Sequence, residues 1–163
     1  MNNFGGRTVV VTGALGGIGK SVVTSLANLG AQIILVDKQE QESATNFLAT
    51  LPSGNHHYFK VELSDAGQIE SLVKSLHPLK PDSLVALAGV VVSGQLAEQS
   101  ELAIKRVIDV NLISQLELSK QIIKYWLAEK MRGNIVFVSS WIDHVPWPGI
   151  TPYRSEEHTS ELQ

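Results

Sequence analysis

Cysteine is absent from the chain, and its absence excludes several kinds of chemistry. Without a thiol there is no disulfide, no thiolate zinc site, no iron–sulfur cluster and no cysteine nucleophile. The remaining candidates for metal ligands are His56, His57, Asp143 and His144, and they lack paired metal-ligand spacing. We therefore predict that the chain has no metal site.

Charge is scarce, and long hydrophobic runs are missing. Charged residues make up 18% of the 163 residues, and the net charge of −3 provides no basic field for nucleic acid or an anionic membrane. The longest apolar run, residues 84–92, is far shorter than the roughly 20 residues of a membrane span. The first residues lack the basic and apolar regions of a signal peptide. We expect a cytoplasmic protein without a membrane or nucleic-acid partner.

Apolar residues are plentiful, at 44%, and occur as short runs that alternate with helical patterns. Strands are predicted over residues 8–11, 32–36, 58–63, 83–88 and 135–139. Helical spacing predicts helices over residues 18–29, 39–51, 69–76, 102–111 and 112–131. This alternation predicts an α/β fold in one domain, a doubly wound, Rossmann-like parallel sheet.

The last of these helices carries two apolar stripes, which together are wider than one sheet face needs. One stripe comprises Leu112, Leu116, Ile123 and Leu127, and its neighbour comprises Leu118, Ile122, Tyr125 and Trp126. Two interpretations stay open with equal weight: a deeply buried helix, or a helix that forms a subunit interface.

A glycine-rich turn, TGALGGIG at residues 12–19, separates the first strand from the first helix. Glycine lets the backbone approach a ligand closely, and the N–H groups that begin the helix attract an anion. The turn therefore predicts a phosphate site. It ends in Gly19-Lys20-Ser21, as a P-loop does, but the first P-loop glycine would fall on Ala14. A P-loop nucleotide-binding protein thus remains the weaker alternative to a dinucleotide fold.

Asp37 ends the second predicted strand, near the distance from the glycines at which a dinucleotide fold places a ribose-binding acid. A carboxylate there accepts hydrogen bonds from the ribose hydroxyls and repels a 2′-phosphate. The sequence therefore favours NAD over NADP as cofactor. An ordinary turn aspartate would be the alternative if Asp37 stood alone.

The glycine spacing G-x-x-x-G-x-G resembles that of the short-chain dehydrogenase/reductase family, and further matches follow in the family's order over residues 7–153. Glu62-Leu63 is similar to its adenine-contacting strand end, with glutamate where aspartate is usual. Ala88-Gly89 matches the end of the N-N-A-G motif, although Ala86 and Leu87 replace the asparagines. The resemblance implies that the cofactor contacts Thr12, Gly13, Leu15, Gly17, Ile18, Gly19, Asp37, Glu62, Leu63, Ala88 and Gly89.

The family's catalytic residues also have counterparts. Asn111 matches the helix asparagine, and Ser140 stands 13 residues before Tyr153, which is the family's interval. The resemblance implies that Tyr153 is the general acid/base for a small alcohol or carbonyl substrate and that Ser140 orients the reacting oxygen. It implies that Asn111 organises a water that leads to a lysine, and that the full-length protein is a homo-oligomer.

Trp141 and Trp147 lie in the segment between Ser140 and Tyr153, which in that family borders the substrate. Two tryptophans suggest an apolar or ring-shaped substrate. Packing in the core explains them nearly as well, so both interpretations stay open.

The C-terminal tail departs from the family pattern Y-x-x-x-K, because Glu157 occupies the position of the lysine. Glu156 and Glu157 add negative charge, which opposes deprotonation of a nearby phenol. Residues 154–163 also resemble a sequencing adapter translated in frame. We therefore expect an incomplete, C-terminally truncated dinucleotide-binding domain over residues 1–153 and a non-native tail over 154–163. If Glu157 is genuine, the alternative is a catalytically dead NAD-binding module.

Overall fold

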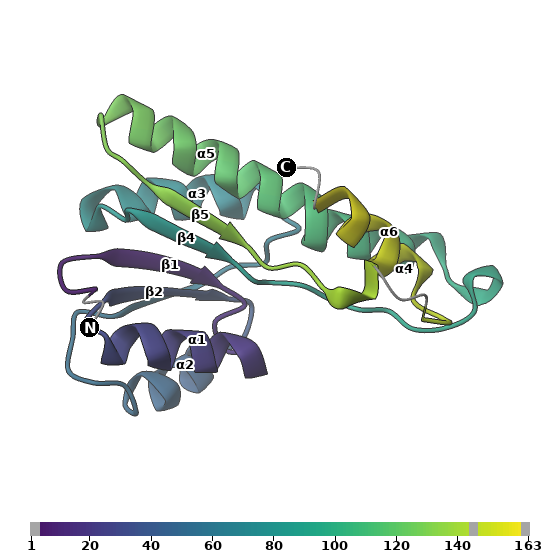
Figure 1. The fold of residues 1–163 in the computed structure, drawn as a ribbon, viewed down its shortest axis with the longest axis horizontal. Coiled ribbons are helices and arrows are strands. Elements are labelled where there is room, and N and C mark those ends of the chain that lie inside the picture. Colours follow the sequence, from purple (N-terminus) through teal and green to yellow (C-terminus); the bar gives the residue numbers. More distant parts are fainter. Residues whose placement is uncertain (1–3, 144–146, 161–163) are drawn as a thin grey trace.

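The computed structural model describes residues 4–143 and 147–160, and its backbone forms a five-stranded sheet flanked by helices (Figure 1). The strands are β1 Thr8–Thr12, β2 Gln32–Asp37, β3 His57–Lys60, β4 Ser83–Ala86 and β5 Asn134–Phe137. The α-helices are α1 Gly17–Asn28, α2 Gln41–Leu48, α3 Ala66–Leu76, α4 Glu101–Ile108, α5 Ser114–Ala128 and α6 Thr151–Ser160. Short 3-10 turns cover His77–Leu79, Leu96–Glu98 and Trp141–Asp143, and a π-helical turn, Asp109–Ile113, joins α4 to α5.

The strands lie in the order β3-β2-β1-β4-β5, and every pair is parallel. The chain moves outward from β1 to β3, returns to the other side of β1 at β4, and then adds β5. The predicted doubly wound sheet is therefore confirmed. Because the strand order reverses between β1 and β4, a crevice is expected at the carboxyl ends of these two strands.

Alternation along β1 divides the interior into two cores. Val10 faces a core with α3 and α5, which includes Ile69, Leu118 and Trp126. Val9 and Val11 face the opposite core, with α1 and α2. Figure 1 shows these two helix layers on opposite faces of the sheet, with α4 and α6 beyond the arrowheads of the strands.

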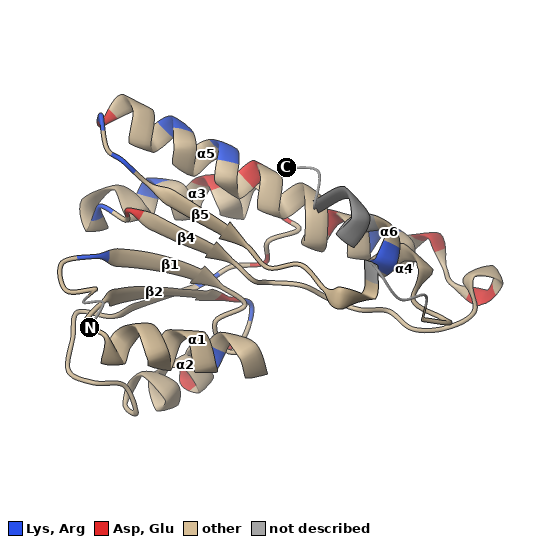
Figure 2. Ribbon diagram, in the orientation of Figure 1, with Lys and Arg blue, Asp and Glu red and all other residues tan. Residues whose placement is uncertain are grey.

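Burial on both faces explains why the strands are apolar rather than alternating. β1 has the sequence TVVVT and is buried along its whole length, and β4 carries no charged residue; β5 is also uncharged, although most of its residues are exposed. In Figure 2 most of the charges lie on helices and connecting turns, and the ribbons of these strands are tan. The interior of the sheet thus excludes charge, which lies mostly on the helices and turns around it.

The third, fourth and fifth strands are shorter than the sequence predicts. Val61 and Leu63 lie past the last paired residue of β3, yet both are buried in the core with α3. Their apolar character reflects this packing, although the N–H of Val61 still donates to the carbonyl oxygen of Asp37 at 2.8 Å. α6 was not predicted, because its sequence TPYRSEEHTS has no apolar periodicity.

The two stripes of α5 have different surroundings. Leu118, Ile122, Tyr125 and Trp126 are buried against the sheet and α3, whereas Leu116, Ile123 and Leu127 are exposed, Leu127 by 73%. In the described chain the interpretation of a deeply buried helix is therefore wrong, because one stripe of α5 is exposed. Within the described ranges, neither α5 nor any other helix is long and apolar enough to cross a membrane.

Candidate functional site

The glycine turn after β1 is closely packed against two parts of the chain. Gly13 has φ +62, and a Cβ there would lie 2.9 Å from the Cα of Ala88. A Cβ on Gly19 would lie 2.1 Å from the carbonyl oxygen of Gly13. These two glycines let the turn fold onto itself and onto the end of β4, because no side chain fits at either position.

Gly17 has a different environment, since a Cβ there would meet nothing within 4 Å. It is the first residue of α1, and Gly16 before it offers no side-chain cap to the helix. The start of α1 therefore has no side-chain cap, and the space beside Gly17 is open. This combination fits an anionic group of a ligand, which backbone N–H groups at a helix start can bind.

Asp37 ends β2 beside this turn, and backbone groups fix its carboxylate. Oδ2 accepts a hydrogen bond from the N–H of Leu15 at 3.0 Å, and Oδ1 accepts one from the N–H of Gln39 at 3.2 Å. The Gln39 side chain in turn donates to the carbonyl oxygen of Leu15 at 3.4 Å. The end of β2 and the glycine turn therefore hold each other in place.

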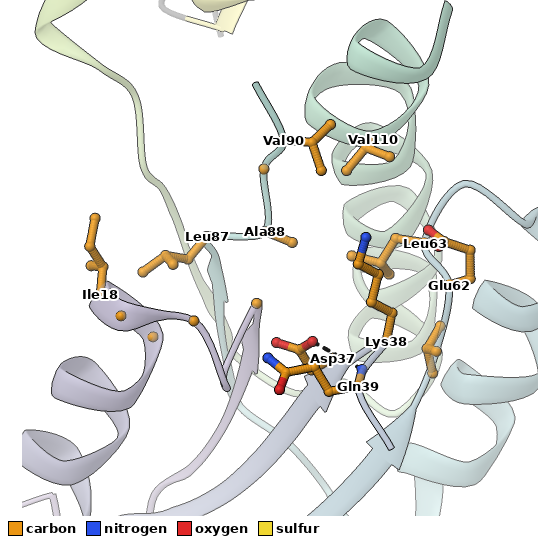
Figure 3. Close-up of a pocket in the computed structure, with 16 residues that line it drawn as sticks. Ile18, Asp37, Lys38, Gln39, Glu62, Leu63, Leu87, Ala88, Val90 and Val110 are labelled. Carbon is orange, nitrogen blue, oxygen red and sulfur yellow. Dashed lines mark hydrogen bonds between the residues drawn. The ribbon is translucent and has the colours of Figure 1, made fainter. Parts of the chain in front are cut away.

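A cavity of about 350 Å³ runs along the carboxyl ends of β1, β2, β3 and β4 (Figure 3). The cofactor residues expected from the sequence that line it are Gly13, Gly17, Ile18, Gly19, Asp37, Glu62, Leu63, Ala88 and Gly89. Thr12 and Leu15 lie behind its wall, with 0% and 4% of their surface exposed. The sequence reasoning did not name Lys38, Gln39, Val90 and Val110, which also line the cavity.

Lys38 is the most consequential of these omissions, because it places a cation next to the Asp37 carboxylate. Figure 3 shows its side chain reaching across the cavity toward Leu63. Its position directly after Asp37 is the signal that could have found it.

Thr12 is buried behind the wall of the first cavity and holds the backbone that forms part of that wall. Its hydroxyl oxygen accepts hydrogen bonds from the N–H groups of Leu87 and Ala88, both at 3.0 Å. These groups lie just past β4, where Ala86 and Leu87 replace the two asparagines of the family motif. A buried threonine therefore fixes the backbone at the end of β4.

Lys20, the residue on which the P-loop alternative depends, is directed elsewhere. Its ammonium group lies 5.5 Å from the centre of the Phe47 ring on α2. A P-loop lysine would instead reach the phosphates. In the described part of the chain, no group of three histidine or carboxylate residues could hold a metal ion.

A second cavity, of about 420 Å³, adjoins the first, and both are lined by Ile18, Leu87, Ala88 and Gly89. Asn111, Ser140 and Tyr153 line it together, although they come from the π-helical turn, the segment after β5 and α6. The Ser140 hydroxyl oxygen accepts a long hydrogen bond, 3.4 Å, from the N–H of Ile142. The fold thus gathers the three expected catalytic residues at one cavity.

Asn111 makes a two-way contact with the backbone of Val90. Its Oδ1 accepts from the Val90 N–H at 2.8 Å, and its Nδ2 donates to the Val90 carbonyl oxygen at 2.9 Å. The π-helical turn inserts one extra residue per turn and alters the helical hydrogen-bond pattern there. The side chain therefore anchors the segment after β4 to the start of α5.

Trp141 and Trp147 are exposed by 61% and 57%, and their rings meet edge to face at 6.1 Å. Packing in the core does not explain them. Trp141 lines the second cavity together with Phe137 and Val91, which gives that cavity an apolar side.

Comparison with known proteins matches the family model described as short chain dehydrogenase over residues 7–157. The chain is 27% identical over 151 residues to dehydrogenase RED2 of Cochliobolus heterostrophus, covering 91% of this chain and 55% of the relative. It is 30% identical over 154 residues to carbonyl reductase (NADPH) 2 of Sus scrofa, covering 94% of this chain and 61% of the relative. The chain therefore spans somewhat over half the length of these curated relatives.

Solved structures give the same result for the fold. A 4-hydroxyisoleucine dehydrogenase complexed with NADH is similar with a TM-score of 0.86 and 25% identity, covering 94% of this chain and 63% of that one. A xylitol dehydrogenase with bound NAD+ has a TM-score of 0.88 at 20% identity, covering 99% and 63%. The second likeness concerns the fold alone.

Proposed function

Because the chain belongs to the short-chain dehydrogenase family, we propose that the protein it comes from is a nicotinamide-dependent oxidoreductase that interconverts an alcohol and a carbonyl compound. The observation that carries the proposal is the meeting of Asn111, Ser140 and Tyr153 at a cavity continuous with the cleft along the glycine turn. The first cavity supplies a binding site for the cofactor, and the second cavity supplies groups that donate and accept a proton.

The first cavity fits a dinucleotide. Open space at Gly17 and the uncapped start of α1 suit the pyrophosphate, and the apolar wall of Val61 and Leu63 suits the adenine ring. Asp37 suits the adenosine ribose, whose two hydroxyls donate hydrogen bonds to a carboxylate. When bound, the nicotinamide ring exchanges a hydride with the carbon of the substrate.

In this proposal Tyr153 gives a proton to the carbonyl oxygen during reduction and takes it back during oxidation. Ser140 donates a hydrogen bond to the same oxygen and orients it. A phenol has a pKa of about 10 and needs a nearby cation to exchange its proton at neutral pH. In this proposal Asn111 organises a water that leads to the lysine expected after Tyr153, and its side chain also holds the backbone of Val90, which lines the first cavity.

The cation that Tyr153 needs is missing from the printed sequence, since Glu157 stands where the family has lysine. Loss of a tuned acid/base costs on the order of 10²–10⁴-fold in rate. We propose that residues 154–163 are not native and that the natural chain continues beyond Tyr153 with Y-x-x-x-K. A protein that binds NAD without turnover is the alternative if Glu157 is genuine.

Resequencing the gene through codon 153 with adapter-free primers decides between these two. A frame that continues with lysine at position 157 is the expected result. A genomic Glu157 followed by a stop would favour the binding module.

The activity is then tested on the complete gene product with NAD and a panel of alcohols and carbonyl compounds. Turnover is followed by the near-ultraviolet absorbance of reduced nicotinamide. Tyr153→Phe is expected to lower kcat by about 10²–10⁴-fold, and Ser140→Ala to lower it by a smaller factor. Unchanged kcat in Tyr153→Phe would contradict the role of the phenol.

We also propose that NAD is preferred over NADP, on the strength of Asp37. Lys38 acts in the opposite direction, because its cation would attract a 2′-phosphate. The carboxylate dominates in this proposal because two backbone N–H groups fix it, whereas Lys38 is long and exposed.

The exposed stripe of α5, formed by Leu116, Ile123 and Leu127, supports a homo-oligomer as a further part of the proposal. A second copy of the protein would cover this apolar surface, which monomeric proteins rarely leave open. Light scattering on the complete gene product measures the oligomeric state directly, and a monomer would contradict this part.

A further inference from the structure

Tyr58, on β3, holds the turn that carries Asp37. Its hydroxyl lies 3.0 Å from the carbonyl oxygen of Asp37 and is also within hydrogen-bonding distance of the carbonyl oxygen of Gln39. These carbonyl groups lie on either side of Lys38, where β2 gives way to α2. A single phenol therefore bridges both ends of the backbone segment that lines the first cavity.

The phenol ring is itself well fixed. It packs against the core between the sheet and the layer of α1 and α2, and Tyr58 is paired with Leu35 across β2 and β3. Burial raises the pKa of Tyr58 to about 12, and the negative charges of Asp37 and Glu40 add to the rise. The hydroxyl keeps its proton at neutral pH, and its single O–H is shared between the two carbonyl oxygens.

The contact is transmitted to the carboxylate through the backbone. Gln39, whose carbonyl oxygen accepts from Tyr58, donates its N–H to Oδ1 of Asp37. The other carboxylate oxygen is held by Leu15 in the glycine turn. The carboxylate thus lies between a turn fixed by β3 and a turn fixed by β1.

We propose that Tyr58 is a positioning residue that holds the Asp37 carboxylate against the glycine turn and thereby sets the discrimination between NAD and NADP. The inference rests on the proposed function, because it assigns a determinant of selectivity to the same cleft. A fixed carboxylate accepts from the 2′-hydroxyl of NAD and repels the 2′-phosphate of NADP. A mobile carboxylate binds the 2′-hydroxyl less well and repels the 2′-phosphate less strongly, so the affinities for NAD and NADP become more similar.

A second link joins the same elements. The ammonium group of Lys60 lies 2.6 Å from Oε1 of Glu40, just past the segment held by Tyr58. Tyr58 and Lys60 are two residues apart on β3, so they leave the strand on the same side. Because both partners of the ion pair are largely exposed, we expect it to hold the turn less firmly than the phenol.

The test compares Tyr58→Phe with Tyr125→Phe in the complete gene product. Tyr125 is a matched control: its hydroxyl also donates to a backbone carbonyl, that of His77 at 3.3 Å, but it lies in the opposite core. Isothermal titration calorimetry with NAD and with NADP gives a Kd for each, and the readout is Kd(NADP) divided by Kd(NAD). A general loss of stability weakens both affinities alike and leaves this ratio unchanged.

Tyr58→Phe is expected to lower the ratio by about 3- to 10-fold, the equivalent of about one net hydrogen bond. Tyr125→Phe is expected to leave it within about 2-fold of the wild type. Lys60→Met provides a second variant should Tyr58→Phe fail to fold, with a smaller change in the same direction. An unchanged ratio in every β3 variant that folds overturns the inference while the proposed function stands. A wild type that binds neither nucleotide, or that prefers NADP, overturns the proposed preference together with this inference.

Discussion

At the scale of single residues, the first cavity depends on a few side chains that are held by hydrogen bonds to residues far away in the sequence. The Asp37 carboxylate is fixed by Leu15 and Gln39, and Thr12 fixes the backbone after β4. These contacts join the ends of separate strands, so each side chain can stabilise the fold and shape the site at the same time.

Asp37→Ser is expected to relax discrimination against NADP, because the negative charge that repels a 2′-phosphate is lost while a short hydrogen-bonding group remains. The measurement is the ratio of kcat/KM for the two cofactors in the complete gene product. With Lys38 still in place, kcat/KM for NADP should rise. A ratio equal to that of the wild type would refute the role of the carboxylate.

Gly17→Ala and Gly19→Ala form a matched pair. An added methyl on Gly17 enters open space, so the variant should fold normally but crowd the pyrophosphate, at a cost of about 1–3 kcal/mol in NAD binding. An added methyl on Gly19 lies 2.1 Å from the carbonyl oxygen of Gly13, so that variant should unfold at lower temperature. Thermal melts without nucleotide and calorimetry with NAD separate the two effects. Equal melting temperatures for the two variants would show that the turn tolerates both methyl groups.

The glycines were predictable because their chemistry is local to one turn, and Asp37 because it ends the next strand at the distance a dinucleotide fold requires. The sequence places Lys38 directly after Asp37, but whether its side chain enters the cavity depends on the course of the turn after β2. Thr12 was expected to contact the cofactor, yet it lies behind the wall, because its hydroxyl is used by Leu87 and Ala88. Such positions depend on strand pairing that a local pattern does not contain.

At the scale of elements, the helix starts differ in how they are capped. The α3 helix is capped by Asp65, whose carboxylate accepts from the N–H groups of Gly67 and Gln68. The α4 helix is capped by Ser100, whose hydroxyl oxygen accepts from the N–H of Ala103. Neither α1 nor α2 has a side-chain cap, but the start of α1 also lines the first cavity, which leaves it available to a ligand.

Asp65→Ala is expected to lower the stability of the fold at neutral pH and to lose this effect in acid. Hydrogen bonds, first from the Gln68 side chain and then from backbone N–H groups, lower the pKa of Asp65. A group with a lowered pKa stabilises the fold above its unfolded pKa, about 3.9, and this contribution disappears as pH falls through the folded value. Urea unfolding at pH 7 and below about pH 4 should show the difference between wild type and variant shrinking.

Ser100→Ala is the control for this prediction. The lost cap costs about 1 kcal/mol, and the cost should be independent of pH because a serine hydroxyl does not titrate in this range. A constant difference in Asp65→Ala across the same pH range would contradict the role of the carboxylate charge.

The order of elements was predictable, but some of their limits were not. The apolar residues 61 and 63 predict a longer third strand, whereas β3 ends at Lys60 and both residues are buried under α3. An apolar residue indicates burial, but the end of a strand is set by where its backbone hydrogen bonding to the neighbouring strand stops. The exposed stripe on α5 could be read as an interface or as a buried face, and only the packing of α3 and the sheet separates the two.

At the scale of the whole molecule, apolar surface is exposed on the outer side of α5 and along β5. Leu116, Ile123 and Leu127 are exposed on the helix, and Val136 and Phe137 on the strand, which is an edge of the described sheet. Open strand edges and large apolar patches favour self-association.

The 163-residue chain produced by itself is therefore expected to be poorly soluble and inactive. Size-exclusion chromatography should show aggregates, and Leu116→Lys with Leu127→Lys should shift material toward smaller species. Soluble, monodisperse wild-type chain that oxidises an alcohol with NAD would contradict this expectation.

The strand order also has a consequence in time. Thr12 and Leu87 are bonded although they are 75 residues apart. On a ribosome that adds about 5–20 residues per second, β1 waits roughly 4–15 s for β4 after it has itself been made. During that interval β1 has only β2 as a neighbour, and its other edge is free to pair wrongly. Synthesis that slows between residues 12 and 83 would lengthen the wait, so the yield of folded protein should respond to codon choice in that stretch.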